Sequence, residues 1–420
     1  VGTGQTLNVT SATTVESGSR ITVLGGFSST LLKIESGGQF DAPSGYTNND
    51  EIQMTGGEAW IMGSTLTNNG FISGQGRINA SLTNNGQVNV SSGTLRFGSQ
   101  VTNNASGFIS GQGSSNIHFN GGLDNSGNVL LSFASSTVFG NITNNSGGMV
   151  SLGGNSTATF VGNMVNNGTV YVGSGSHAVF GGATSGSGDF PGSGTVEFVD
   201  SFSPGSSPAE IHFGGDVLLG SLAEVEIELG GLIPGTHHDL LNIAGTANLD
   251  GTLQLAPLAP YSDPATRGTA DDFTIITTGS RSGTFSTVQY DGSTLAPDFE
   301  TDGDGSFRDH VAGGLFRSVT YTSTAVSVQN LLASAGDTDG DRDVDTVDLT
   351  GMIINYTGAT GSGTTWLTGD TDGDGDTDTV DLTTAIINFT SARNAAAAVP
   401  EPSALLLLVL AVGCLAVARA

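Results

Sequence analysis

The chain has 420 residues, including 65 Gly but only 11 Lys and Arg together, and its formal net charge is −28 at pH 7. This balance excludes nucleic acids and anionic lipid headgroups as partners, because too few cations are present to neutralise phosphates. The only cysteine, Cys414, cannot form an intrachain disulfide. An acidic chain rich in Asn, Ser, Thr and Gly is typical of extracellular proteins. Since the sequence opens at Val1 without a secretory signal, we expect a leader to have been removed or the sequence to be a fragment.

An Asn pair returns about every twenty residues between residues 47 and 168, in motifs such as LTNNG at Leu66 and Leu82, VTNNA at Val101 and MVNNG at Met164. Between the pairs lie short stretches with apolar side chains at every second residue, which predict brief strands separated by turns. A unit of twenty residues cannot bury a core alone, whereas stacked units cover each other. The repeat therefore predicts a mainly β protein with a parallel β-solenoid (β-helix) over residues 1–200.

The Asn pairs fit the corners of such a solenoid. Asn tolerates left-handed backbone and can hydrogen-bond to its equivalent in the next coil. The alternative is an ordinary β-sandwich, in which Asn-Gly marks tight hairpins. The recurrence of whole units, and not of turns alone, favours the solenoid.

A change of pattern follows SFSPGSSP at Ser201. Residues 205–330 contain AEVEIELGG, GTHHDLLNIAGTANLDGTLQL and DDFTIITTGSRSGTFSTVQY, in which strands and Gly turns alternate. This stretch resembles segments near the ends of β-helical passenger regions in autotransporters and related bacterial surface proteins. The resemblance implies a further β-rich region.

Two acidic segments further along the chain are near copies, GDTDGDRDVDTVDL from Gly336 and GDTDGDGDTDTVDL from Gly369. Carboxylates at this spacing repel one another unless a cation lies among them. The EF-hand type of calcium loop takes side chains at positions one, three, five, nine and twelve and a carbonyl at seven. The acids at these positions are Asp337, Asp339, Asp341, Asp343, Asp345 and Asp348 in the first copy, and Asp370, Asp372, Asp374, Asp376, Asp378 and Asp381 in the second. We predict two Ca²⁺ sites.

The two loops differ at position six, which needs a tight turn. Gly375 occupies it in the second loop and Arg342 in the first. A non-Gly residue in left-handed conformation costs about 1–2 kcal/mol, so we expect the first site to be the weaker.

Each loop leads into a matching apolar segment, LTGMIINY from Leu349 and LTTAIINF from Leu382, in which Leu, Ile, Ile and an aromatic residue are predicted to form one apolar helix face. Two such loop–helix units 33 residues apart resemble a type I dockerin over residues 336–392. The resemblance implies a small α-helical calcium-binding module that binds a cohesin-like domain. The partner-reading positions of the family map onto Thr346, Val347, Thr379 and Val380.

The segment ETDGDGSF from Glu300 offers a third candidate loop. It places Asp302, Asp304 and Gly305 suitably but has Arg308 at position nine and Val311 at position twelve. We therefore interpret it as a surface turn.

Residues 399–420 contain an apolar run of 15 residues from Ala404 to Ala418, which is somewhat below the roughly 17–25 residues usual for a spanning helix. This run follows a short Pro-Glu-Pro motif and precedes an arginine, and the combination resembles the PEP-CTERM sorting signal of bacterial exosortase systems. The resemblance implies a C-terminal transmembrane helix, a transient membrane anchor and an exosortase-type processing enzyme. Its residues are Val399, Pro400, Glu401, Pro402 and Arg419.

An enzyme is not expected. Cleavage of a glycosidic bond needs two carboxyl groups within several ångströms of each other, yet Asp124 is the only acid between Ala59 and Gly188. The sequence HHD at residues 237–239 is interpreted as a turn or partly buried polar patch, because adjacent strand residues point to opposite faces. Glu224, Glu226 and Glu228 alternate and predict a solvated strand face.

Together these features predict an exported structural or adhesive protein of the cell surface or extracellular matrix, with a calcium-dependent docking module and a sorting tail. The alternative function is a non-catalytic or accessory carbohydrate-binding component of a polysaccharide-degrading assembly, recruited through the dockerin. In both cases an extracellular polysaccharide is a candidate partner.

Overall fold

The computed structural model describes residues 6–132, 135–205, 208–259, 271–295 and 307–390. The chain divides into two compact units. Unit 1 comprises residues 1–309 and 317–330, and unit 2 comprises residues 310–316 and 331–420. The sorting-signal residues at positions 399–402 and 419, the apolar run before Arg419 and the turn at residues 300–305 lie outside the described residues.

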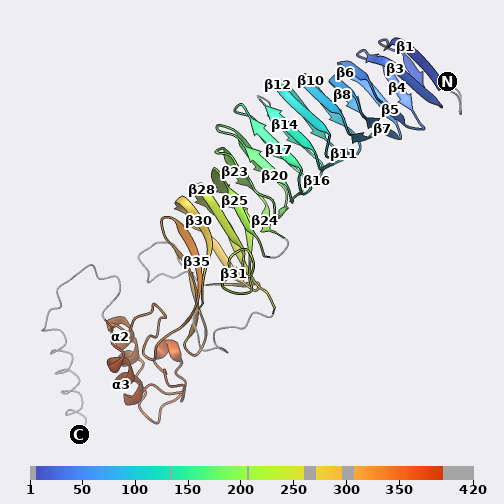
Figure 1. Cartoon of the computed structure of the whole chain (residues 1–420). Coiled ribbons are helices and arrows are strands. Elements are labelled where there is room, and N and C mark those ends of the chain that lie inside the picture. The colour runs from blue at the N-terminus through green and yellow to red at the C-terminus, as the bar shows by residue number, and fades with distance from the viewer. Residues whose placement is uncertain (1–5, 133–134, 206–207, 260–270, 296–306, 391–420) are drawn as a thin grey trace, which may run out of the picture. The chain divides into compact units, whose positions relative to one another are not determined.

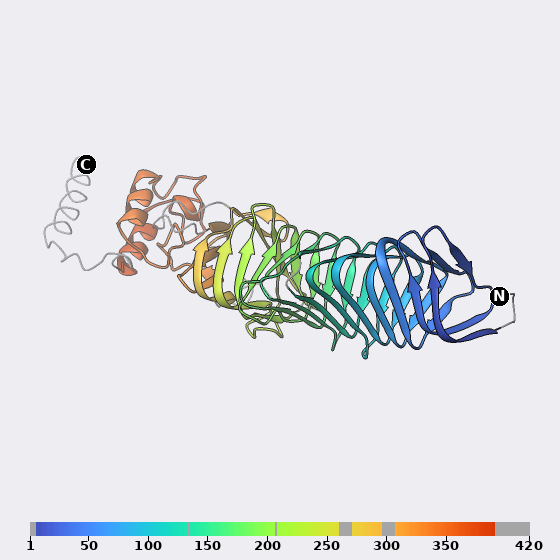
Figure 2. The ribbon, with the colours of Figure 1, turned by 90° about the horizontal axis from the view of Figure 1, so that it is seen from above.

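Unit 1 is a parallel β-solenoid, as the repeat predicts, built from three sheets of 11, 13 and 11 strands. Its coils stack along one direction, as Figures 1 and 2 show. The first sheet contains β1 (Thr6–Val15), β2 (Arg20–Thr22), β3 (Gly26–Ile34), β4 (Gln39–Ala42), β6 (Glu51–Gly63), β8 (Phe71–Ile78), β10 (Gln87–Phe97), β12 (Phe108–Phe119), β14 (Asn128–Ser132), β17 (Met149–Gly153) and β20 (Thr169–Val172).

The other two sheets complete the coils. The second contains β5 (Tyr46–Asn48), β7 (Thr65–Asn68), β9 (Ser81–Asn84), β11 (Val101–Asn103), β13 (Leu123–Asn125), β16 (Ile142–Asn144), β19 (Met164–Asn166), β22 (Thr184–Gly186), β24 (Ser201–Pro204), β27 (Glu224–Leu229), β29 (Thr252–Pro257), β31 (Thr287–Tyr290) and β32 (Ser293–Thr294). The third contains β15 (Ser135–Val138), β18 (Thr157–Phe160), β21 (His177–Phe180), β23 (Thr195–Phe198), β25 (Glu210–Phe213), β26 (Asp216–Leu219), β28 (Leu240–Leu249), β30 (Asp271–Gly283), β33 (Phe307–Ala312), β34 (Leu315–Tyr321) and β35 (Ala325–Leu332).

The core of the solenoid follows from the alternation of side chains along each strand. Parallel pairing in register places like residues above one another, for example Leu82 beside Val101. Inward aromatic rings stack in the same way, with ring centroids 5.0 Å apart for Phe160 and Phe180. Each coil therefore buries its apolar face against the next, and the core runs the length of the unit.

The first Asn of each pair, together with Asn125 of the variant motif LDNSG, forms a buried row of amides along the second sheet, here called the inner Asn ladder. In each step the Nδ2 of one residue donates to the Oδ1 of the next, over distances of 2.7–2.8 Å. Its members are Asn48, Asn68, Asn84, Asn103, Asn125, Asn144 and Asn166. The expected hydrogen bond between equivalent residues of successive coils is thus confirmed.

The expectation of left-handed backbone at the Asn pairs is wrong. Among the residues that the structure describes, the non-Gly residues with positive φ are Asn155, Asp291 and Arg342, and none belongs to these pairs. The first Asn instead ends a strand in extended conformation and turns its side chain inward. Its amide satisfies polar groups that the corner would otherwise leave buried without partners.

The stretch 205–330 shares its sheets with the rest of the solenoid. The second sheet runs through β24 and β27 to β31, and in the third sheet β35 pairs antiparallel with β30 and is followed by β34 and β33. Glu224 and Glu226 are exposed and Glu228 is half-buried on one face of β27, as predicted.

The interpretation of residues 237–239 as a turn or partly buried polar patch is confirmed. His238 and Asp239 are both fully buried although they are adjacent, while His237 is exposed. Asp239 accepts backbone N–H groups of Ala209 at 2.7 Å and Glu228 at 2.8 Å. Through these two hydrogen bonds Asp239 connects neighbouring segments of the solenoid and has a structural role.

The described part of unit 2 contains two helices, α2 (Thr346–Ile354) and α3 (Thr379–Ile387), and a short 3₁₀ helix, η1 (Trp366–Thr368). A small core of Val344, Leu349, Met352 and Ala385 joins α2 to α3. The helices in the described part of the chain are all too short or too polar to cross a bilayer.

Candidate metal centre

The acidic residues of unit 2 lie together in the two loops that precede α2 and α3. Four groups of three carboxylates each have oxygen atoms within 4.8 Å of one another. The groups are Asp337, Asp339 and Asp348; Asp343, Asp345 and Asp348; Asp370, Asp372 and Asp374; and Asp376, Asp378 and Asp381. Like charges at this separation repel strongly, so the arrangement is suited to a cation.

Each loop is held by backbone N–H groups that donate to its first aspartate. In the first loop Gly340 donates to Asp337 Oδ1 at 2.6 Å and Arg342 donates to Oδ2 at 3.2 Å. In the second loop Gly373 and Gly375 donate to the oxygens of Asp370 at 2.8 and 3.0 Å. Because the two networks match bond for bond, the sequence duplication corresponds to a duplicated geometry.

The aspartate at position twelve both closes the loop and starts the helix. Asp348 accepts N–H bonds from Thr338 at 2.7 Å and from Asp345 at 2.8 Å. Asp381 accepts the equivalent bonds from Thr371 at 2.8 Å and Asp378 at 3.0 Å.

Position nine has a role that the sequence prediction missed. Asp345 and Asp378 are the N-caps of α2 and α3, and each accepts the N–H of the residue two further on at 2.6 Å. An N-cap aspartate satisfies free N–H groups of the first helical turn. The spacing D-x-x-D in the sequence, from Asp345 to Asp348 and from Asp378 to Asp381, carries the signal for such a capping box.

Position six is strained in the first loop, as predicted. Arg342 has a φ of 78°, whereas Gly375 adopts a φ of 93° in the second loop. Only glycine takes this left-handed conformation without steric cost. The strain therefore falls on the first loop alone.

Burial and mutual repulsion raise the pKa of carboxyl groups in both loops. Burial, followed by the carboxylates of Asp348 and Asp341, raises the pKa of Asp337 to about 7 against its N–H hydrogen bonds. Burial and the neighbouring acids also raise the pKa of Asp376. The Oδ1 atom of Asp376 is buried and has no hydrogen-bond partner among the described residues. A hard cation bound by oxygen ligands would remove this cost, so the residues present fit a calcium ion.

The helix faces differ from the prediction. Leu349 is buried and Phe389 packs against the small core, but the Ile residues and Tyr356, which were expected to share the apolar face, are exposed. Ile354 and Ile387 are each 76% exposed, and Val347 and Val380 are each 54% exposed. Since each Val and Ile are seven residues apart, they lie on one face of their helix. The core instead uses Met352 and Ala385, which the simple apolar pattern did not distinguish.

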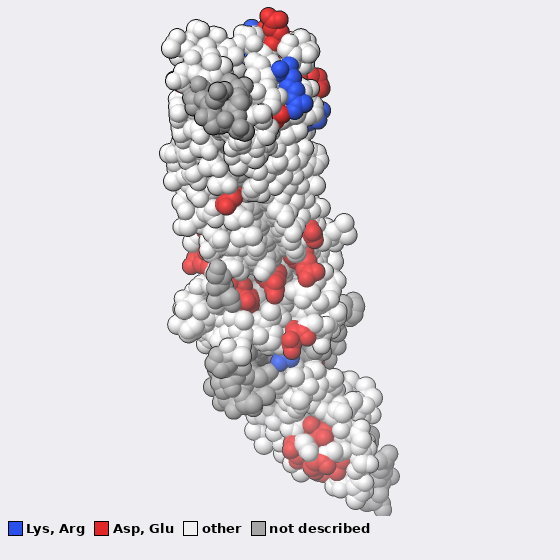
Figure 3. Space-filling model, turned by 90° about the vertical axis from the view of Figure 1, so that its right-hand side faces the viewer, with Lys and Arg blue, Asp and Glu red and all other residues white. Residues whose placement is uncertain are grey.

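The solenoid offers no comparable cluster. Within the described ranges, every group of three or more potential metal ligands lies in the two loops of unit 2. The face of the molecule in Figure 3 shows few charged side chains over the middle coils.

A comparison of the chain with known protein families, curated proteins and solved structures finds no match.

Proposed function

We propose that this chain is an exported, surface-associated structural or adhesive protein, whose solenoid is a stalk and whose unit 2 is a calcium-dependent docking module of the dockerin type. The matched pair of acidic loops carries the proposal. Twelve carboxylates are gathered in two networks with the same hydrogen bonds, which is costly for a protein without a bound cation. Calcium binding in small modules of this kind supplies folding energy.

The docking face that we propose comprises Thr346, Val347 and Ile354 of α2 and Thr379, Val380 and Ile387 of α3. These residues form an exposed apolar strip on each helix, and such strips mark interaction surfaces in soluble proteins. The two strips have nearly the same composition, so either helix can present the same contact to a cohesin-like domain. A few of these residues would carry most of the binding energy.

Calorimetry of the full chain with a purified type I cohesin domain tests this proposal. We expect binding in calcium and none with excess chelator. If the two strips are equivalent, Val347→Asp alone weakens binding by about RT ln 2, roughly 0.4 kcal/mol, whereas Val347→Asp with Val380→Asp abolishes it. Binding that ignores both substitutions, or that persists in chelator, contradicts the proposal.

The sorting function is proposed from the sequence of residues 399–420. Their short apolar run with one terminal Arg is a poor permanent anchor but a sufficient pause during export. We propose that an exosortase-type enzyme processes the chain near Pro402. Mass spectrometry of secreted protein should find that the residues after this point are missing; a mature extracellular form ending at Ala420 contradicts processing.

A second candidate is an accessory carbohydrate-binding component of a polysaccharide-degrading assembly, recruited through the same module. A polar cleft at the N-terminal end of the solenoid, lined by hydroxyl, amide and carboxylate groups, favours this candidate.

A further inference from the structure

The inner Asn ladder ends at Asn48 with an acceptor that is not used. Asn48 Nδ2 donates to Asn68 Oδ1 at 2.7 Å, so its own Oδ1 is turned toward the preceding coil. That Oδ1 atom is buried and has no hydrogen-bond partner in the part of the chain that the structure describes. An unpaired buried carbonyl oxygen costs free energy, and the ladder leaves one here.

The preceding coil does not supply the missing donor. Its equivalent inward residue is Ser29, because Ser29 and Asn48 are both buried and each donates to the carbonyl two residues further on. The Ser29 hydroxyl lies 2.8 Å from Leu31 O and 3.0 Å from Ser11 O. A single hydroxyl proton is therefore already engaged, and serine is shorter than asparagine.

A second row of amides ends at the same place in the opposite sense. On the outer face Asn104 donates to Asn85, Asn85 to Asn69, and Asn69 Nδ2 to Asn49 Oδ1 at 2.9 Å. Asn49 thus accepts from the ladder and keeps its Nδ2 donor for the side facing the preceding coil. The two rows together present one acceptor and one donor at the first edge of β5.

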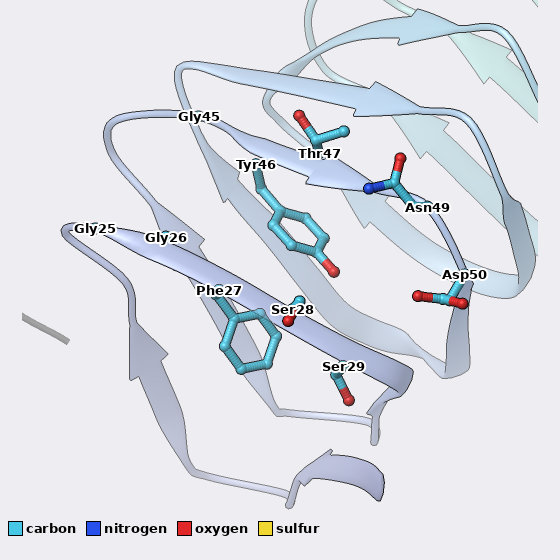
Figure 4. A pocket seen from close by; sticks show the side chains of 10 residues that line it. All are labelled: Gly25, Gly26, Phe27, Ser28, Ser29, Gly45, Tyr46, Thr47, Asn49 and Asp50. Carbon is cyan, nitrogen blue, oxygen red and sulfur yellow. The ribbon is translucent and has the colours of Figure 1, made fainter. Parts of the chain in front are cut away.

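A cleft of about 290 Å³ lies at this edge (Figure 4). β5 pairs only with β7, and the part of β3 from Gly26 to Ser29 pairs only with β1. The two strand edges face the cleft from its two sides. Its lining is Gly25, Gly26, Phe27, Ser28, Ser29, Gly45, Tyr46, Thr47, Asn49 and Asp50.

The residues that line the cleft indicate which chemical class of ligand it can bind. Ser28, Thr47 and Tyr46 offer hydroxyl groups and Asp50 a carboxylate, and no Lys or Arg lines the cleft. An anion is disfavoured by Asp50, and an apolar ligand would leave these polar groups without water. Burial, and then the charge of Asp50, raise the pKa of Tyr46 to about 12, so the phenol keeps its proton. Figure 4 shows the Tyr46 hydroxyl directed between the two strands.

We propose that this cleft binds a neutral sugar residue of a glycan. Each sugar hydroxyl both donates and accepts, so it can donate to Asp50 while accepting from Asn49 Nδ2 or a lining hydroxyl. The volume is at the lower end of that of small-molecule sites, which suits a single residue or a chain end. This inference rests on the second candidate function, and it gives that function a site.

The test is saturation-transfer NMR of the full chain with D-glucose, D-galactose, D-mannose and N-acetyl-D-glucosamine, each compared with D-glucuronate. Excess chelator is present throughout, so the result does not depend on the calcium loops and a failure here leaves the docking proposal standing. We expect at least one neutral sugar to bind and glucuronate to bind at least tenfold more weakly. Absence of binding by all four neutral sugars, or equal binding of glucuronate, overturns the site.

Three variants locate the binding. Asp50→Ala should weaken the sugar at least tenfold, while Asn85→Ala, in the middle of the outer row and away from the cleft, should leave it unchanged. Thr47→Val, at an exposed position, removes one lining hydroxyl with little change of volume. If Asp50→Ala fails to fold, weaker sugar binding by Thr47→Val tests whether the cleft is the binding site. Sugar binding that is unaffected by the cleft variant that folds refutes the assignment.

Discussion

The inner Asn ladder should be the most sensitive polar feature of the solenoid, and Asn103 is its best test. Asn103 Nδ2 donates to Asn125 Oδ1 at 2.8 Å, and Asn103 Oδ1 accepts from Asn84 at 2.8 Å. Substitution by Ala leaves Asn125 Oδ1 buried without that donor and opens a small void. Each unsatisfied buried group costs about 1–3 kcal/mol, and we expect a total loss of about 2–4 kcal/mol.

Asn85→Ala is the matched control. It removes the same side chain from the outer row, where water can replace the amide, and surface changes of this kind usually alter stability by less than about 0.5 kcal/mol. Asn103→Leu separates the polar loss from the void, because Leu fills the space but leaves the same partners unpaired.

Guanidinium unfolding of the full chain, followed by circular dichroism, measures these effects through the transition midpoint. The slope must be reported with it, because stacked repeats depart from two-state unfolding. A similar shift for Asn103→Ala and Asn85→Ala, or full rescue by Asn103→Leu, would refute the view that buried amide pairing stabilises the stack.

Three further predictions concern carboxylates and backbone strain. Asp239→Asn should lower the free energy of unfolding of the solenoid by about 1–3 kcal/mol, because an amide offers one acceptor oxygen where two backbone N–H groups point. The control is Asp216→Asn, since Asp216 is exposed and accepts a backbone N–H from Thr246. The denaturant midpoints of the two variants are compared. In chelator, unit 2 should lose stability as pH rises from about 4 to about 7. The reason is the raised pKa of Asp337, because the folded state then holds a proton that the unfolded state has released. A melting temperature that increases over this pH range would contradict this prediction. Arg342→Gly should stabilise the first loop by about 1 kcal/mol and tighten its calcium binding in calorimetry, whereas an unchanged affinity would mean that the left-handed φ carries no cost.

Local spacing was enough to predict the solenoid and the acidic loops. Alternating apolar residues and a twenty-residue repeat determine how coils must stack, and the duplicated aspartates determine which carboxylates meet. Features that depend on tertiary contacts between distant segments could not be predicted from this spacing. The burial of both His238 and Asp239 follows from a loop that turns back on neighbouring coils, which strand alternation does not describe.

The helices show the same limit. Leu349 and Ile354 are equally apolar in the sequence, yet only Leu349 packs against the other helix, and the selection depends on how α2 and α3 meet. The cleft beside β5 also had no signal in the chain, because it arises where one pair of successive strands fails to join. The end of an Asn row is visible only when donors and acceptors are followed from coil to coil.

Trp366 gives a direct way to measure whether unit 2 binds calcium. The chain has two Trp residues, and Trp366 Nε1 donates to the carbonyl oxygen of Asp337 in the first loop at 2.7 Å. In the full chain carrying Trp60→Phe, Trp366 emission therefore reports on the loop, and calorimetry of the same protein counts the ions. We predict two calcium ions per chain, a change in Trp366 emission that chelator reverses, and one ion in Asp381→Ala. No bound calcium, or binding that survives both Asp348→Ala and Asp381→Ala, would contradict it.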